Sequence, residues 1–302
     1  MAWLRARPVV AGLIGASVIA FSAILVRLAG VSPETAAVFR CAYALPVLGL
    51  FALRERRSFG PRPREGRWLG FVAGAFFAAD LIFWHHAIQD VGAGLATVLG
   101  NLQVVLVAFI AWAVLSERPS NRMFVAVPSA LLGAVMISGL LEQDAFGSDP
   151  GRGTVYGLLT TVAYSGFLLI LRQTNVDVKR PAGPLLDATA SAAVVALIAG
   201  SAYGAVDLVP EWPAHGWLVL MSFSSQVVGW LLISVSLPRL PAAVTSLLLL
   251  IQPVAAVVLA AVLLGEAPSL LQIGGVVIIL AVVVLATARR PAAGLPPAPA
   301  AG

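Results

Sequence analysis

The sequence predicts an all-α integral membrane protein with ten transmembrane helices in two inverted five-helix repeats. Of its 302 residues, 60% are hydrophobic and only 11% are charged, whereas a soluble domain carries roughly 25% charged residues. A water-soluble fold cannot bury so much apolar surface, so lipid must be the solvent for much of the chain. The apolar runs are long and continuous, without the period-two alternation of a β-barrel, and this favours helices.

Apolar windows of about 19 residues place the helices in two groups of five. The first group covers residues 9–29, 33–53, 67–87, 93–115 and 122–140, and the second covers 153–172, 183–204, 214–236, 241–265 and 269–288. Short links rich in proline, glycine and charge separate these segments. We therefore predict a first repeat over 1–142, an inverted second repeat over 143–290 and a disordered Pro/Ala-rich cytoplasmic tail over 291–302.

The basic residues predict the orientation. With a cytoplasmic N-terminus and ten crossings, the outer side keeps only Arg27 and Arg152, and Arg40 lies within the membrane. The other 16 of the 19 lysines and arginines fall on the inner side: Arg5, Arg7, Arg54, Arg56, Arg57, Arg62, Arg64, Arg67, Arg118, Arg122, Arg172, Lys179, Arg180, Arg239, Arg289 and Arg290. This is the bias that the positive-inside rule requires, and nine or eleven helices would scramble it. We expect a multi-pass protein of the cytoplasmic (inner) membrane with both termini in the cytoplasm.

An internal repeat relates the two groups of helices. Shifted by 149 residues, Leu99–Ser120 lies over Leu248–Ser269. Apolar identities arise cheaply by chance, but an ordered set of Gln, Glu, Pro and Ser does not. Five helices per repeat is an odd number, so the two copies must be inverted relative to each other. Inverted repeats build many secondary transporters, which bind their substrate near the midplane where the halves meet.

The start of the first helix also has features of a signal peptide, since Arg5 and Arg7 precede its apolar run. At a shift of 145 residues, however, Gly12-Leu13 falls on Gly157-Leu158, so this helix belongs to the repeat. We expect it to be retained.

Several functional classes lack support in the sequence. There is no Walker loop, no GxSxG elbow and no zinc-type cysteine spacing. The only cysteine, Cys41, lies in an apolar run and cannot form an intrachain disulfide. The net charge of +5 comes from residues that flank apolar spans, which favours lipid headgroups over nucleic acid as their partners. We expect no cofactor, no metal site and no catalytic residues.

These features resemble the drug/metabolite transporter superfamily, specifically its ten-helix EamA type. The resemblance covers the chain up to Arg290. It is carried by Pro33 with Phe39-Arg40, by the helix ends Leu115-Ser116-Glu117-Arg118-Pro119 and Leu264-Gly265-Glu266-Ala267-Pro268, and by Ile251-Gln252-Pro253-Val254. The fourth helix departs from the pattern, with Val104 where the second half has Pro253. The resemblance implies secondary transport of amino acids, nucleosides, drugs or other metabolites, often outward, through a cavity lined mainly by the first four helices of each repeat.

Arg40 and Asp80 are the most informative polar residues. Each lies seven residues from the outer end of its helix, roughly 10 Å below the surface at 1.5 Å per residue. Two charges at one depth on adjacent helices invite pairing. They form either a structural ion pair or a site in which Asp80 binds a cationic group or a proton. Phe76, Phe77, Asp80 and Trp84 share one helix face. The aromatic rings either frame the acid as a binding pocket or serve helix packing alone.

Other polar residues complete the candidate cavity. Gln103 and Gln252 are repeat-related, and they either form interhelical hydrogen bonds or line the cavity at symmetric positions. The remaining candidates are Tyr164, with Thr160 and Thr161 on the sixth helix, Ser222, Ser225 and Gln226 on the eighth, and Thr245 on the ninth.

Three further groups have a structural interpretation. Glu117 and Glu266 lie at helix ends next to proline, which favours a solvated or turn-stabilising role over gating. His85 and His86 are adjacent, so they point about 100° apart and cannot easily share one metal ion. Gly66, Gly70 and Gly74 form a ridge that predicts close helix packing.

The function predicted from the sequence is secondary transport of small metabolites across the cytoplasmic membrane by alternating access, with export as the direction. The substrates are amino-acid-like, nucleoside-like or cationic/aromatic compounds. A lipid flippase on the same fold is the alternative, and a membrane-embedded enzyme ranks last, because only Asp80, His85 and His86 could serve it. The expected partners are a small-molecule substrate and membrane lipids, with no nucleic acid. We expect a monomer, and a homodimer stays open.

Overall fold

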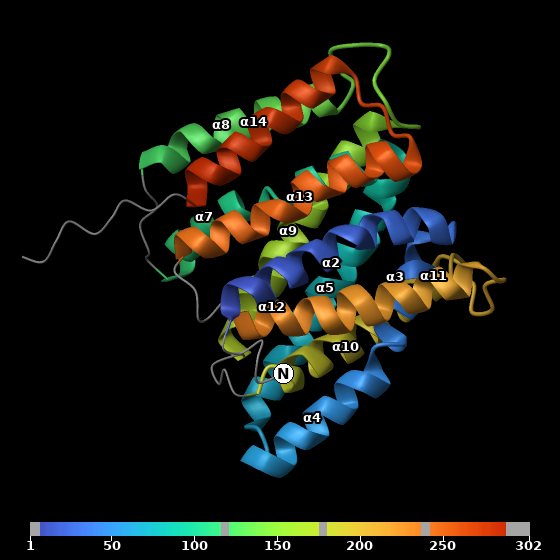
Figure 1. The fold of residues 1–302 in the computed structure, drawn as a ribbon, viewed down its shortest axis with the longest axis vertical. Helices are drawn as coiled ribbons and strands as arrows, with labels where there is room; N and C mark the ends of the chain where they lie inside the picture. The colour runs from blue at the N-terminus through green and yellow to red at the C-terminus, as the bar shows by residue number, and fades with distance from the viewer. Residues whose placement is uncertain (1–6, 116–120, 175–179, 237–241, 288–302) are drawn as a thin grey trace, which may run out of the picture.

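The protein folds as a helical bundle. The structure is a computed structural model, and it describes residues 7–115, 121–174, 180–236 and 242–287. All regular secondary structure in these ranges is helical (Figure 1). The predicted all-α class is therefore confirmed.

The helices follow one another with short links. The first half contains α2 (Pro8–Ala29), α3 (Pro33–Ala42), α4 (Leu45–Phe59), α5 (Arg64–Val91), α6 (Ala93–Gly100), α7 (Gln103–Leu115) and α8 (Asn121–Ile137). The second half contains α9 (Pro150–Thr174), α10 (Ala182–Ala202), α11 (Ala214–Met221), the π-helix η1 (Ser222–Gly229), α12 (Trp230–Ser236), α13 (Ala242–Leu264) and α14 (Leu270–Thr287).

Six helical segments of the described chain are long and apolar enough to cross a membrane. They are Pro8–Ala29, Pro33–Phe59, Arg64–Val91, Pro150–Leu171, Ala182–Ala202 and Ala214–Ser236. Four shorter apolar helices, Ala93–Val107, Phe124–Ile137, Ile251–Leu264 and Leu270–Leu285, occupy the places where the sequence predicts the other four spans. The chain is a multi-pass membrane protein, and the count of ten crossings stays a prediction.

Local sequence explains where individual helices begin and end. The Ser32 hydroxyl accepts a hydrogen bond from the Thr35 amide at 3.2 Å, and Pro33 occupies the first turn, so α3 has a complete N-terminal cap. Gly30 ends α2 with φ of 62°, a left-handed conformation that glycine adopts without strain. The predicted single helix over 93–115 is broken at Asn101, where the chain makes a turn between α6 and α7.

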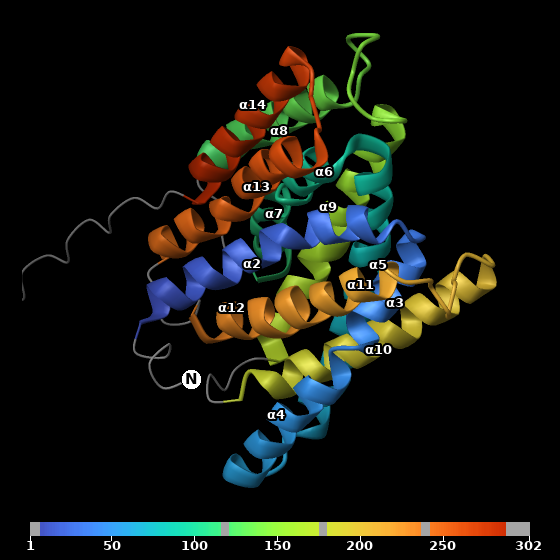
Figure 2. The same ribbon diagram turned by 45° about the vertical axis from the view of Figure 1, so that its right-hand side comes forward.

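The two halves are packed against each other along most of their length. Helix α5 contacts α9 and α10, α2 contacts α11, α12 and α13, and α8 contacts α14. In Figures 1 and 2, α8 and α14 lie side by side at one edge of the bundle, and α4 lies at the opposite edge.

The predicted glycine ridge is confirmed at two of its three positions. A Cβ at Gly70 would lie 2.9 Å from the Asp187 side chain, and one at Gly74 would lie 2.3 Å from the Ala188 carbonyl, so both glycines let α5 approach α10 closely. Gly66 has nothing within reach. The Ser191 hydroxyl also donates to the Phe71 carbonyl at 2.7 Å and fixes the two helices in register.

Candidate functional site

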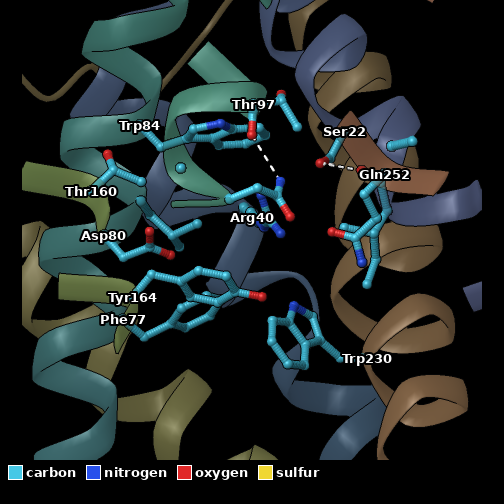
Figure 3. Close-up of a pocket in the computed structure, with 15 residues that line it drawn as sticks. Ser22, Arg40, Phe77, Asp80, Trp84, Thr97, Thr160, Tyr164, Trp230 and Gln252 are labelled. Atoms are coloured by element: carbon cyan, nitrogen blue, oxygen red, sulfur yellow. Dashed lines mark hydrogen bonds between the residues drawn. The ribbon is translucent and has the colours of Figure 1, made fainter. Parts of the chain in front are cut away.

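A cavity of about 70 Å³ lies inside the bundle. Its lining comes from α2, α3, α5, α6, α9, α12 and α13, together with Asn101 between α6 and α7 (Figure 3). No described residue of α8 or α14 contributes to it. The side chains that can bind a solute are Ser22, Arg40, Phe77, Asp80, Trp84, Thr97, Asn101, Thr160, Tyr164, Trp230 and Gln252.

Arg40 reaches the cavity from α3 with only 3% of its surface exposed. Its Nε donates a hydrogen bond to Gln226 Oε1 at 3.2 Å, and its guanidinium lies 5.7 Å from the centre of the Trp84 ring. The Gln226 Nε2 donates in turn to Thr189 Oγ1 at 3.0 Å, which fixes the amide with its oxygen toward Arg40. The Ser222 hydroxyl donates to the Arg40 carbonyl at 2.8 Å. The guanidinium is therefore held in place by neutral groups.

One buried nitrogen of this guanidinium has no partner among the described residues. Arg40 Nη1 is buried and makes no hydrogen bond with any of them. A buried donor that loses its water and gains no partner costs on the order of 1–3 kcal/mol, and more when it is charged. A ligand acceptor in the cavity would remove that cost.

Asp80 enters the same cavity from α5 with 7% of its surface exposed. Its carboxylate makes no hydrogen bond or ion pair with the described residues, which include Arg40. The structural ion pair, one of the two interpretations that the sequence left open, is absent. Two opposite charges thus line one cavity without neutralising each other directly.

Aromatic side chains form a rigid wall of the cavity. Phe77 stacks on Phe167 with ring centres 4.4 Å apart and planes at 19°. The Trp230 ring meets Phe77 edge-on at 6.0 Å and Tyr164 edge-on at 6.3 Å. Such packed rings hold a flat or apolar part of a ligand at little cost in side-chain entropy.

The structure brings half of the sequence-predicted residues to the cavity. Six of the twelve line it: Arg40, Phe77, Asp80, Trp84, Tyr164 and Gln252. Gln226 and Ser222 lie behind Arg40 and position it.

The other four lie elsewhere. The Ser225 hydroxyl donates to the Val18 carbonyl at 3.3 Å, and Gln103 is buried away from the cavity. Phe76 packs against Gly166 of α9 and is partly exposed. Of the four residues predicted to share a face of α5, only Phe77, Asp80 and Trp84 line the cavity. Thr245 lies on α13, but its side chain is outside the described residues.

Thr160, noted in the sequence beside Tyr164, also lines the cavity. Four polar or aromatic lining residues were not among the sequence candidates: Ser22, Thr97, Asn101 and Trp230. Thr97 and Asn101 are four residues apart, and Asn101 Nδ2 donates to the Thr97 carbonyl at 2.8 Å. Two polar side chains at helical spacing inside an apolar run are a signal that sequence reasoning could have used.

One end of the bundle is closed by contacts between the two halves. Arg152 at the start of α9 binds Asp90 near the end of α5 with two bonds, Nε–Oδ2 at 2.8 Å and Nη2–Oδ1 at 2.7 Å. Glu266, after α13, accepts hydrogen bonds from the Ala93 and Gly94 amides at the start of α6. We call Asp90, Arg152, Glu266 and these two amides the latch.

The structure decides between the two roles that the sequence favoured for Glu266. The solvated role is wrong, because Glu266 is buried; the carboxylate instead caps the start of a helix of the other half. Its sequence counterpart, Glu117, lies outside the described residues.

The adjacent histidines at this end face different partners. His86 Nε2 lies 3.0 Å from Glu34 Oε1, and its ring stacks on Tyr156. His85 Nδ1 lies 3.0 Å from the Pro33 carbonyl. Both therefore tie α5 to the start of α3.

A bundle of apolar helices around a small cavity lined by charged side chains defines a multi-pass membrane protein with an internal polar cavity. The model of the EamA-like transporter family matches residues 6–139 and 151–288. The chain belongs to this family of membrane transporters of small compounds, as its sequence motifs predict. No curated protein matches the chain. A solved crystal structure is similar over 94% of this chain and 98% of its own, with a TM-score of 0.61 and 16% identity, which shows a shared fold alone.

Proposed function

We propose that the protein is a secondary transporter that moves small amino-acid-like zwitterions across the cytoplasmic membrane by alternating access. The observation that carries the proposal is the cavity that holds Arg40 and Asp80 without a direct bond between them. A carboxylate on the free Arg40 nitrogen and an ammonium group near Asp80 would compensate both charges at once. The aromatic wall then accommodates an apolar side chain.

The other predicted substrate classes satisfy the site less fully. A cationic aromatic compound would pair with Asp80 but leave the buried Arg40 nitrogen without an acceptor. A nucleoside offers hydrogen bonds but neither charge. Leaving a buried charge without a counter-charge is expensive, so the zwitterion ranks first.

The contacts between helices support an inverted repeat. In the repeat, α2 corresponds to α9, α5 to α11–α12, and α6–α7 to α13. The contact of α5 with α9 then has its counterpart in the contact of α11–α12 with α2. The contact of α6 and α7 with α9 has its counterpart in that of α13 with α2. The α8–α14 pair maps onto itself. We propose ten crossings, with the four shorter apolar helices completing the set, and a two-fold axis in the membrane plane.

The proposed orientation makes the latch an outer closure. In that orientation Arg67 in the first turns of α5, and Arg62 just before it, are cytoplasmic, and the other end of α5, which carries Asp90, faces outward. Because the latch closes the outer end, a solute in this state would reach the cavity from the cytoplasmic side. We propose export as the direction of net transport, which the family resemblance implies.

Counterflow in proteoliposomes tests the substrate class. Purified protein in liposomes loaded with unlabelled amino acids should accumulate the matching labelled amino acid, while labelled nucleosides and cationic dyes stay at background. Arg40→Gln and Asp80→Asn should each abolish the exchange. The buried Gln103→Met, outside the cavity, serves as the control and should keep it.

Other outcomes would overturn the proposal. Counterflow of a cation that survives Arg40→Gln would replace the zwitterion with a cationic substrate. Scrambling of a fluorescent lipid, with no movement of soluble compounds, would favour the flippase instead. Chemical conversion of the substrate during the assay would point to an enzyme.

A further inference from the structure

A second hollow lies at the arginine-rich end of the bundle and shares no lining residue with the central cavity. It has a volume of about 280 Å³ and lies between the end of α4, the link to α5, the start of α5 and the start of α10. Its charged lining residues are Glu55, Arg56, Arg62, Arg67, Arg180 and Asp187. An adjoining hollow of about 720 Å³ shares Arg62 and Arg180 and extends to the end of α9.

The back of this hollow is built from residues with fixed partners. Arg62 forms an ion pair with Asp187. The Arg180 Nη1 donates to the Gly60 carbonyl at 3.1 Å, and its guanidinium lies 5.7 Å from the centre of the Phe59 ring. The Glu55 carboxylate accepts hydrogen bonds from the Ala182 and Gly183 amides, each at 2.9 Å. Both carboxylates are thus already engaged by the protein.

Two more arginines stand at the mouth of the hollow. Arg56 and Arg67 line it, are exposed, and form no ion pair or hydrogen bond with the described residues. Four arginines against two carboxylates leave a local charge of +2. That charge calls for an anion, and the guanidinium geometry suits phosphate oxygens.

The surface beside the hollow is apolar. Leu50, Leu53 and Phe59 of α4 are exposed, and Leu53 also lines the hollow. In the proposed orientation this end of α4 lies at the level of the inner headgroups, with its apolar face toward the acyl chains. A ligand that carries both a phosphate and long hydrocarbon chains can contact the arginine-lined hollow and the apolar face of α4 at once. Free phosphate can contact only the hollow.

We propose that this hollow binds the headgroup of an anionic phospholipid of the inner leaflet. The lipid phosphate lies between Arg56 and Arg67, and its acyl chains run along Leu50 and Leu53. The site rests on the proposed membrane orientation, but it is separate from the substrate cavity. Basic pockets between helices on the cytoplasmic side have the chemistry to bind such headgroups. The bound lipid bridges the end of α4 and the start of α5, beside the start of α10.

Lipid titration on purified, delipidated protein in a neutral detergent tests the site. Native mass spectrometry would count retained phosphatidylglycerol, with phosphatidylcholine as the neutral comparison. At about 1 kcal/mol per basic residue, Arg56→Gln and Arg67→Gln should each weaken retention about fivefold, and the double variant about 25-fold. The matched controls are Arg57→Gln and Arg64→Gln, which are exposed neighbours that do not line the hollow.

Each alternative has its own signature. Equal losses in the lining and control variants would mean diffuse surface charge and would overturn the site. Retention of phosphatidylcholine at the level of phosphatidylglycerol would do the same. If inorganic phosphate or glycerol 3-phosphate competes as strongly per mole as the lipid, the hollow binds a free phosphate compound instead. Amino-acid counterflow measures the function of the central cavity and does not depend on this hollow. If lipid retention fails the test while counterflow is intact, only the lipid site is overturned and the proposed function stands.

Discussion

The side chain of Glu266 holds the amide of Ala93, a residue 173 positions earlier in the chain, at 2.7 Å. Its second carboxylate oxygen accepts a bond from the Gly94 amide at 3.1 Å. The first amides of a helix carry a partial positive charge, so a carboxylate placed there is stabilised. Gly92 makes the approach feasible, since its φ is 91° and a Cβ there would lie 2.8 Å from Glu266 Oε2. One carboxylate therefore joins the first half of the chain to the second.

The first prediction concerns this cap. Glu266→Gln replaces a charged acceptor with a neutral amide, which can satisfy only one of the two α6 amides by accepting. We expect a loss of on the order of 1–3 kcal/mol in the free energy of unfolding. Thermal unfolding in detergent measures it, with the exposed Glu211→Gln as the control. Equal melting temperatures for the two variants would contradict the role of Glu266.

The second prediction concerns the ion pair of the latch, whose members differ in exposure. The Arg152 side chain is 60% exposed and the Asp90 side chain only 5%. Arg152→Gln leaves a buried carboxylate without its cation, whereas Asp90→Asn leaves a guanidinium that water can solvate. Arg152→Gln should therefore be the more destabilising of the two changes. The reverse order in thermal unfolding would show that the pair is not held as described.

The third prediction concerns Arg40 and Asp80. Because they form no direct ion pair, Asp80→Asn breaks no hydrogen bond and should lower the melting temperature less than Arg152→Gln does, while it abolishes counterflow. The double variant Arg40→Met with Asp80→Leu should fold and be inactive. Transport at the wild-type rate in the double variant would show that neither residue belongs to the substrate site.

The fourth prediction concerns topology. Arg289 and Arg290 follow the last apolar segment, and ten crossings place them with the other basic residues. A phosphatase fused to the C-terminus should be inactive, and a fluorescent protein that matures only in the cytoplasm should be bright. An active phosphatase fusion would rule out ten crossings with a cytoplasmic N-terminus.

Sequence reasoning found the charged part of the site because a charge inside an apolar run is expensive and therefore conspicuous. Arg40 and Asp80 stood out for this reason. Thr97 and Asn101 did not, since small uncharged side chains can satisfy themselves on the helix backbone and leave a weak signal. The predicted helix face on α5 included Phe76 because helical spacing alone does not fix how a helix is rotated.

Tertiary packing decides what helical spacing leaves open. The contacts of Gly70 and Gly74 with α10 set the rotation of α5, which turns Phe77 into the cavity and Phe76 toward α9. The sequence also could not predict the partner of Glu266, because the amides that it binds belong to the backbone of a helix in the other half. The sequence pattern marks a carboxylate at a helix end and carries no information on which distant helix begins beside it.

The burial of Cys41 has a practical consequence for measuring motion in this protein. It is the only thiol in the chain, it lies next to Arg40 in α3, and none of its surface is exposed. The unmodified protein should therefore be silent to membrane-impermeant maleimides. Cysteines introduced in pairs across the two ends of the bundle can then carry spin labels or fluorophores with no background to remove. Distances between such labels, recorded with and without substrate, would follow the opening of each end directly.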